Sequence, residues 1–355
     1  MADMHFDVPF TVLNNRNNLG EKRRLEQREA LRKIINYIKN NNINYLFIAG
    51  DLYEHEYIRK SSIEFINNLF KEIPNTRIFI TPGNHDPYIN NSMYKTFKWN
   101  DNVHIFDRKI EVIEEQECDI YGFGFNDFYC RDSGIENIKI KNTNKINILI
   151  THGALTGGNL ENMEYNPLNK NRLKNLGFDY IALGHIHKLD YNSELDQRIV
   201  YPGSTISMGF DEMGEHGVIY GDIDKEKFKI EFIPIDNREF KELEMDISNI
   251  FSKEELIEKI NNLNLNSNYY YKIILKGDKN FNININELFQ YIIKENIIKI
   301  KNDTKLKINL EEISKNNNLK GLFAREILKE LNNNNYDKKT LENVLSIGLD
   351  LFDKK

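Results

Sequence analysis

Cysteine is scarce in this chain of 355 residues, which contains only Cys118 and Cys130. The two lie in separate segments, so they form neither a short metal-binding pair nor a disulfide framework, and a reducing cytoplasm fits this usage best. No apolar run reaches membrane-spanning length, and the first residues contain no apolar stretch of the signal-peptide type. We therefore expect a cytoplasmic protein without membrane association.

An excess of positive charge is also missing, since 48 Lys and Arg face 54 Asp and Glu, for a formal net charge of −6. This argues mildly against a chain coated in nucleic acid, although a local basic groove stays open because phosphate contacts depend on the local field. One basic cluster does occur, but Glu21, Glu26 and Glu29 lie among its residues. We therefore slightly favour its interpretation as the solvated face of a helix over a contact surface for DNA phosphates. Its members are Lys22, Arg23, Arg24, Arg28, Arg32 and Lys33.

What the sequence has in quantity is ordinary globular material, with 40% hydrophobic and 29% charged residues. The chain exceeds the usual size of one domain, so we expect more than one. Strand and helix patterns alternate through 1–235 and change after Pro234. The sequence thus predicts a core domain (1–235), a small α/β capping domain (236–310) and a C-terminal helical tail (311–355).

The first region has the pattern of a layered α/β fold. Apolar residues predict a helix over 21–40 by their spacing, at Leu25, Leu31, Ile34, Ile35 and Ile38. A second helix is predicted over 63–73. Short apolar runs predict strands over 45–49, 77–80, 119–123, 146–150, 180–183, 199–201, 217–220 and 228–233. In the tail, amphipathic helices are predicted over 319–331 and 340–352.

Five short polar motifs stand out, and four of them directly follow an apolar strand. They are Asp3-Met4-His5, Gly50-Asp51, Gly83-Asn84-His85-Asp86, Thr151-His152-Gly153 and Gly184-His185-Ile186-His187. Ligands of open α/β sheets bind beyond the carboxyl ends of strands, so these loops should converge.

The residue types in the motifs favour a metal site. Carboxylate, amide and neutral imidazole groups suit first-row divalent metals. In Asp-x-His and His-x-His, one residue separates the two ligands, so both point to the same side of an extended chain. Each motif alone is more often a turn or a strand edge. Five in order, each at a strand end, leave that interpretation little weight.

These motifs, in this order, resemble those of the calcineurin-like metallophosphoesterases over about 1–235. Within that superfamily the chain is similar to SbcD-type DNA repair exonucleases, especially their YhaO-like branch. The finer resemblance is carried by Ala2 to Phe10, Tyr201-Pro202-Gly203-Ser204, Gly321-Leu322-Phe323-Ala324-Arg325 and Ile347-Gly348-Leu349-Asp350.

The resemblance implies a layered β-sandwich flanked by helices and a site for two divalent metal ions, with manganese favoured. One ion would be bound by Asp3, His5 and His187. The other would be bound by Asn84, His152 and His185. Asp51 would bridge both, and two such cations generate a nucleophile at neutral pH.

Three further residues receive roles from the same resemblance. His85 would donate a proton to the leaving oxygen or stabilise the transition state, a task that suits imidazole. Asp86 would orient His85 or cap the following segment. Some relatives carry a phosphate-contacting histidine after Gly-Asp; His55 lies one position off that pattern and is equally a surface histidine.

The start of the chain departs from the family pattern, because only Met1 and Ala2 precede Asp3. Family members have a full hydrophobic strand there. A start placed too late would remove most of that strand and weaken the Asp3/His5 metal site.

The sequence therefore predicts a metal-dependent DNA exonuclease that hydrolyses phosphodiester bonds in DNA repair. One alternative is a phosphodiesterase or phosphatase for a small substrate such as a cyclic nucleotide, and another is a catalytically weak scaffold subunit. The implied partners are DNA and, through the C-terminal helices, an SbcC-type coiled-coil ATPase. Those helices could equally pack only within the chain, and a homodimer is left open.

Overall fold

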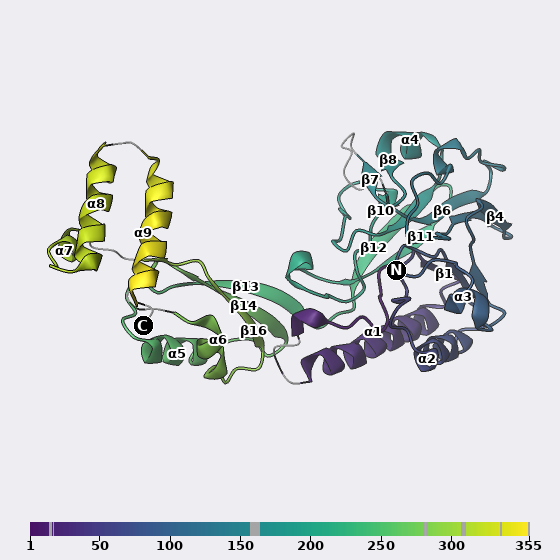
Figure 1. The fold of residues 1–355 in the computed structure, drawn as a ribbon. Coiled ribbons are helices and arrows are strands. Elements are labelled where there is room, and N and C mark those ends of the chain that lie inside the picture. Colours follow the sequence, from purple (N-terminus) through teal and green to yellow (C-terminus); the bar gives the residue numbers. More distant parts are fainter. Residues whose placement is uncertain are drawn as a thin grey trace. The chain divides into compact units, whose positions relative to one another are not determined.

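The computed structural model describes residues 1–13, 16, 18–156, 164–279, 281, 283–306, 310–333 and 336–353. The chain divides into two compact units. The first consists of Met1–Lys241 and Asn266–Tyr271, and the second of Glu242–Leu265 and Lys272–Lys355. Figure 1 draws both units.

The first unit is a mixed α/β body. Its helices are η1 (Thr11–Leu13), α1 (Leu19–Asn41), α2 (Lys60–Lys71), α3 (Met93–Thr96), η2 (Ile135–Asn137), α4 (Lys170–Asn175) and η3 (Phe210–Glu212). Its strands are β1 (Tyr45–Ile48), β2 (Arg77–Ile80), β3 (Val103–Ile105), β4 (Glu111–Glu114), β5 (Cys118–Phe123), β6 (Ile146–His152), β7 (Leu155–Thr156), β8 (Leu168–Asn169), β9 (Tyr180–Gly184), β10 (Ile199–Val200), β11 (Gly217–Ile223) and β12 (Phe228–Pro234).

In helix α1, the apolar spacing predicts most of the buried residues correctly but fails at one position. Leu31, Ile34, Ile35 and Ile38 are buried as their spacing predicts. Leu25 is 62% exposed, so its assignment to the apolar face was wrong. Helices α1 and α2 lie side by side near β1 (Figure 1).

Two sheets build the core of this unit. The smaller sheet has the order β1-β2-β3, with all pairs parallel. The larger has the order β10-β9-β6-β5-β4, in which only β4 and β5 pair in antiparallel fashion. Strands β11 and β12 form a separate antiparallel pair.

The two sheets pack face to face because side chains alternate along each strand. Ile148 and Ile150 of β6 join Phe79 of β2 in one buried cluster. Leu149, between them, points to the opposite cluster, which includes Leu173 of α4. The predicted layered α/β sandwich with flanking helices is therefore confirmed.

The second unit is also a mixture of helices and strands. Its elements are β13 (Glu239–Asp246), α5 (Lys253–Asn261), β14 (Tyr269–Lys276), β15 (Asp278–Lys279), α6 (Ile285–Gln290), β16 (Ile297–Asn302), β17 (Lys305–Leu306), α7 (Leu310–Ser314), α8 (Leu319–Asn333) and α9 (Lys338–Asp353). The strands β13 and β14 have residues in both units, and the sheet order is β13-β14-β16. A finer division of this unit into a capping domain and a tail stays a prediction. No helix of the described ranges is long and apolar enough to cross a membrane.

The C-terminal helices pack on one another through only part of their apolar surface. Ile327 of α8 and Leu341 and Leu345 of α9 form a small buried cluster. The exposed apolar side chains, with their exposed fractions, are Leu319 (72%), Leu322 (54%), Val344 (42%), Ile347 (63%), Leu351 (62%) and Phe352 (42%). The buried residues of α8 are Gly321, Ala324 and Ile327.

Candidate metal centre

The strand ends of the first unit bring the five motifs to one place. Asp51 follows β1, Asn84 follows β2, His152 ends β6 and His185 follows β9. The N-terminal segment joins them because the Asp3 N–H donates to the Gly50 carbonyl at 3.1 Å. The structure thus gathers all seven candidate ligands that the sequence singled out.

Glycine at two of these strand ends permits the close approach. Gly50 has a φ of +89°, a conformation that glycine adopts without steric cost because it has no Cβ. A Cβ at Gly184 would lie 1.8 Å from the Ala49 carbonyl oxygen. Larger residues here would push β9 away from β1, and with it the His185 loop.

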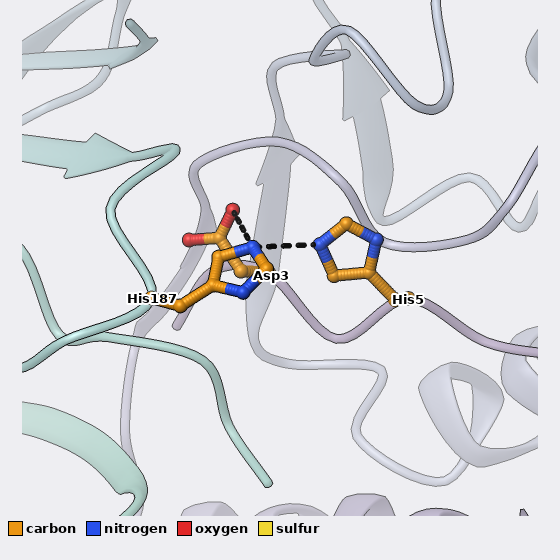
Figure 2. Close-up of side chains that lie close together, drawn as sticks. All are labelled: Asp3, His5 and His187. Atoms are coloured by element: carbon orange, nitrogen blue, oxygen red, sulfur yellow. Dashed lines mark hydrogen bonds and ion pairs between the residues drawn. The ribbon is translucent and has the colours of Figure 1, made fainter. Parts of the chain in front are cut away.

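Asp3, His5 and His187 form one compact group (Figure 2). The His5 and His187 Nε2 atoms lie 3.1 Å apart, and His187 Nε2 lies 4.0 Å from Asp3 Oδ1. Asp3 is fully buried and His5 is 2% exposed. The short N-terminal segment, expected to leave this group weakly supported, places both side chains inside the fold.

The outer nitrogen of each histidine is held by a carboxylate. His5 Nδ1 lies 2.7 Å from Glu54 Oε1, and His187 Nδ1 lies 3.0 Å from Glu212 Oε2. A carboxylate accepts, so each Nδ1 carries the hydrogen and each neutral Nε2 presents a lone pair. Two lone pairs facing each other at 3.1 Å need a cation or a proton between them. This donor set fits a divalent metal.

Asp51, Asn84, His152 and His185 form the neighbouring group. His152 Nε2 lies 2.9 Å from Asn84 Oδ1 and 3.3 Å from Asp51 Oδ2. The His185 Nδ1 atom lies 3.3 Å from the same Asn84 oxygen. The His152 Nδ1–H donates to the Ala49 carbonyl, so its Nε2 is also a free lone pair.

Asp51 lies between the two groups. Its Oδ2 atom is 3.7 Å from His5 Nε2, on the side of the first group, as well as 3.3 Å from His152 in the second. It is 1% exposed. This is the position that a carboxylate shared by two cations requires.

The charges of the cluster favour bound cations. Burial alone would lower the pKa of His152, but the Asp51 carboxylate raises it to about 9. Burial also lowers the pKa of His187, whereas Glu212 raises it to about 9. Burial raises the pKa of Asp3. The carboxylates thus attract positive charge to His152 and His187, and metal binding would displace the protons of these imidazoles.

His85 differs from the buried histidines in its exposure and contacts. Its side chain is 45% exposed, and its backbone N–H donates to Asp51 Oδ1 at 2.9 Å. Burial lowers the pKa of His85, but its hydrogen bond to Glu54 raises it to about 9. His85 therefore carries a proton near neutral pH at the edge of the ligand cluster.

Asp86 is fully buried and supports the loops rather than a histidine ring. Its carboxylate accepts from the backbone N–H groups of Gly83 at 2.6 Å, Leu52 at 2.7 Å and Asp51 at 3.1 Å. The His85 ring instead donates its Nδ1–H to Glu54.

His55 and the basic cluster also acquire definite surroundings. The His55 backbone N–H donates to the His85 carbonyl at 2.9 Å, while its ring packs on Phe128. Arg23 is fully buried in an ion pair with Asp236, so the interpretation of it as solvated was wrong. Arg23 can be buried because the Asp236 carboxylate pairs with it, and no local sequence pattern predicts this pair.

Two carboxylates in the site were missed from the sequence. Glu54 lies three residues after Asp51 and directly before His55. Glu212 lies in η3, far from any motif, and also accepts from the Ser204 hydroxyl at 2.9 Å. A carboxylate next to a ligand motif could have signalled Glu54, whereas nothing local signals Glu212.

Comparison with known proteins places this site in a family. The family model for calcineurin-like phosphoesterases matches residues 1–189. The uncharacterized metallophosphoesterase YhaO of Bacillus subtilis strain 168 is 27% identical over 241 residues, which are 63% of this chain and 58% of YhaO. One component of the nuclease SbcCD from Staphylococcus epidermidis, SbcD, is 26% identical over 311 residues, 77% of each chain.

The family match covers more than half of the chain and includes every candidate ligand. The family uses divalent metal ions, and the donor set described above fits them. The chain belongs to the calcineurin-like phosphoesterase family and is a metal-dependent phosphoester hydrolase.

Proposed function

We propose that this chain is a DNA exonuclease that hydrolyses phosphodiester bonds with two divalent metal ions, manganese being favoured, and that it acts in DNA repair. The observation that carries the two-metal part is the place of Asp51 between two ligand groups. One ion would be held by Asp3, His5, His187 and Asp51, and the other by Asn84, His152, His185 and Asp51. Two such cations, when bound, supply a nucleophile at neutral pH and offset charge on the phosphate oxygens.

The chain's own residues account for the remaining chemistry. With Nδ1 of His85 held by Glu54, the proton available to a leaving oxygen is the one on Nε2. The exposure of this ring leaves room for a phosphodiester beside it. His5, His152 and His187 are each anchored through Nδ1, so their Nε2 atoms stay oriented toward the ions.

DNA is favoured over a small phosphoester by the relative that covers most of the chain. The staphylococcal protein, by its name part of a nuclease, aligns over 77% of both sequences, so the similarity extends past the family match into the second unit. A site for a small cyclic nucleotide would not need that unit.

The decisive experiment measures hydrolysis of end-labelled single- and double-stranded DNA in manganese, with a cyclic nucleotide as the competing substrate. We expect stepwise shortening of DNA and little turnover of the cyclic nucleotide. Asp51→Asn serves as the inactive control, because the neutral amide bridges two cations poorly. Turnover of the cyclic nucleotide alone would establish the small-substrate alternative, and turnover of neither by metal-loaded protein would overturn the proposed nuclease.

We also propose that an SbcC-type coiled-coil ATPase docks on the exposed apolar side chains of α8 and α9. Leu319 and Leu322 are 72% and 54% exposed on α8, and Ile347 and Leu351 are 63% and 62% exposed on α9. An apolar helical face that packs on a partner helix is a common mode of recognition. The name of the staphylococcal relative describes one component of an assembly, which is consistent with such a partner.

A further inference from the structure

Aromatic side chains form a column on one side of the ligand cluster. The Tyr165 and His185 ring centroids lie 5.1 Å apart, with 35° between the ring planes. The Tyr129 ring stacks on Tyr165 at 5.9 Å and 29°. Tyr129 is 57% exposed. The column therefore leads from a candidate metal ligand to the surface.

Backbone contacts fix this pair relative to the site. Cys130 and Tyr165 form an isolated parallel bridge, and the Cys130 N–H donates to the Glu164 carbonyl at 2.8 Å. The Tyr165 carbonyl accepts from the Ala154 N–H at 3.0 Å. Ala154 follows His152 by two residues, so the tyrosines are held against the strand end that carries a ligand.

Phe128 extends the aromatic surface to the other flank of the site. Its ring lies 5.9 Å from the His55 ring and is 38% exposed. His55 is itself bonded through its backbone N–H to the His85 carbonyl. The consecutive residues Phe128 and Tyr129 thus reach toward the His85 side and the His185 side of the ligand cluster.

Exposed aromatic faces beside a phosphoester-cleaving centre suit a substrate with a flat ring near the scissile phosphate. Every nucleobase has such a face, and stacking of bases on aromatic side chains tolerates any sequence. A base inside a duplex has both faces covered by its neighbours and offers only its edges. A stacking site consequently favours an unpaired nucleotide over one inside a duplex.

We propose that Tyr129 and Tyr165 form a stacking subsite for an unpaired base that adjoins the scissile phosphodiester. This inference rests on the proposed DNA hydrolysis and adds its substrate class, a strand that is single-stranded where it is cut. The ring, rather than the hydroxyl, is the recognising group. Phenylalanine should therefore replace either tyrosine without loss.

The test compares two single-stranded DNA substrates that differ only near the labelled end. One carries ordinary nucleotides there, and the other carries base-free tetrahydrofuran residues. The wild-type protein should cleave the base-bearing strand with a kcat/KM about 5- to 150-fold higher, the range expected for one stacked base. Tyr129→Leu and Tyr165→Leu should lose this preference, and Tyr129→Phe and Tyr165→Phe should keep it.

Tyr220→Leu is the matched control, because Tyr220 pairs with Tyr37 at 5.6 Å instead of with a site histidine. It should retain the wild-type preference. Binding of the same labelled strands to metal-free protein, followed by fluorescence anisotropy, should show the same ratio without turnover.

The outcomes separate the subsite from the function on which it rests. Equal cleavage of both strands by the wild-type protein overturns the subsite and leaves DNA hydrolysis standing, and this comparison needs no variant to fold. Leucine variants that are folded and keep the preference also overturn it. If the wild-type protein cleaves no DNA, the proposed nuclease function fails and the subsite fails with it.

Discussion

The Nδ1 atom of His85 donates a hydrogen bond to Glu54 Oε2 over a distance of 2.9 Å. The other oxygen of the same carboxylate accepts from His5 Nδ1 at 2.7 Å. Burial alone would raise the pKa of Glu54, but these two hydrogen bonds lower it to about 2. One charged side chain therefore orients a candidate metal ligand and the candidate proton donor together.

Replacing Glu54 with Gln should weaken the orientation of both His5 and His85. The amide can accept from one histidine only, and its NH2 group forces the other to present an Nδ1 lone pair, which turns an Nε2–H toward the site. We expect metal affinity and turnover to fall by about 10- to 100-fold. Titration calorimetry of the metal-free protein measures the affinity.

Glu56→Gln is the control for this substitution, because Glu56 is an exposed carboxylate two positions further along. It should leave metal affinity unchanged. A Glu54→Gln protein with wild-type affinity and turnover would show that Glu54 positions neither histidine.

His85 and Asp51 should separate catalysis from metal binding. His85→Ala should keep the metals and lose most turnover, by roughly 10²- to 10⁴-fold, the usual contribution of general acid catalysis. Asp51→Ala should lose both metal and turnover, since one carboxylate serves two cations. Elemental analysis beside the rate assay distinguishes the two. Loss of metal from His85→Ala would mean that this ring is itself a ligand.

Removing one partner of the buried pair Arg23–Asp236 should destabilise the fold strongly. Arg23 is fully buried, and Asp236 is 4% exposed. Arg23→Met would leave the Asp236 charge buried without its partner, so we expect a loss of about 3–5 kcal/mol in the free energy of unfolding. Trp99, the single tryptophan, lies in the first unit and reports its unfolding by fluorescence in urea.

Lys60→Met provides the exposed comparison, because the Lys60 and Glu64 side chains are 74% and 52% exposed. Surface pairs contribute little, so its effect should stay within about 0.5 kcal/mol. Similar losses for the two substitutions would show that burial does not strengthen the Arg23 pair.

The two thiols should react slowly below pH 9. Burial raises the pKa of both Cys118 and Cys130, so less of either is thiolate at neutral pH than for a free cysteine. Alkylation of the half-buried Cys130 by iodoacetamide should accelerate as the pH rises from about 7 to 9. Cys118, 4% exposed, should react only after unfolding in urea. Mass spectrometry that found Cys118 labelled as fast as Cys130 in native protein would contradict this.

The C-terminal helices should be dispensable for the metals and required for the ATPase. A chain that ends at Glu311 should keep its metal content, because every candidate ligand precedes residue 188. Leu319→Glu and Leu322→Glu, at exposed positions, should abolish co-purification of an SbcC-type ATPase from the native cell without unfolding the helices.

Leu195→Glu is the matched control, since Leu195 is a 62% exposed leucine of the first unit. It should co-purify the ATPase at the wild-type yield. Full yield from the shortened chain, or from both helix variants, would reduce α8 and α9 to packing elements.

The sequence alone determined where the buried strands lie and which polar residues follow them. Apolar runs at 77–80 and 146–150 correspond to β2 and β6, because a buried parallel strand is a near-continuous apolar run. Polar residues at the ends of such strands should meet at one edge of the sandwich, and the resemblance to a known family then named the seven candidate ligands among them.

Only the tertiary structure decided which groups hold those ligands in place. Glu212 reaches His187 across 25 positions of sequence, and Arg23 reaches Asp236 across more than 200. Periodicity carries information about neighbours along one element, whereas these contacts depend on how separate elements pack. The column of Tyr129, Tyr165 and His185 is of the same kind, because a bridge between distant segments brings its rings together.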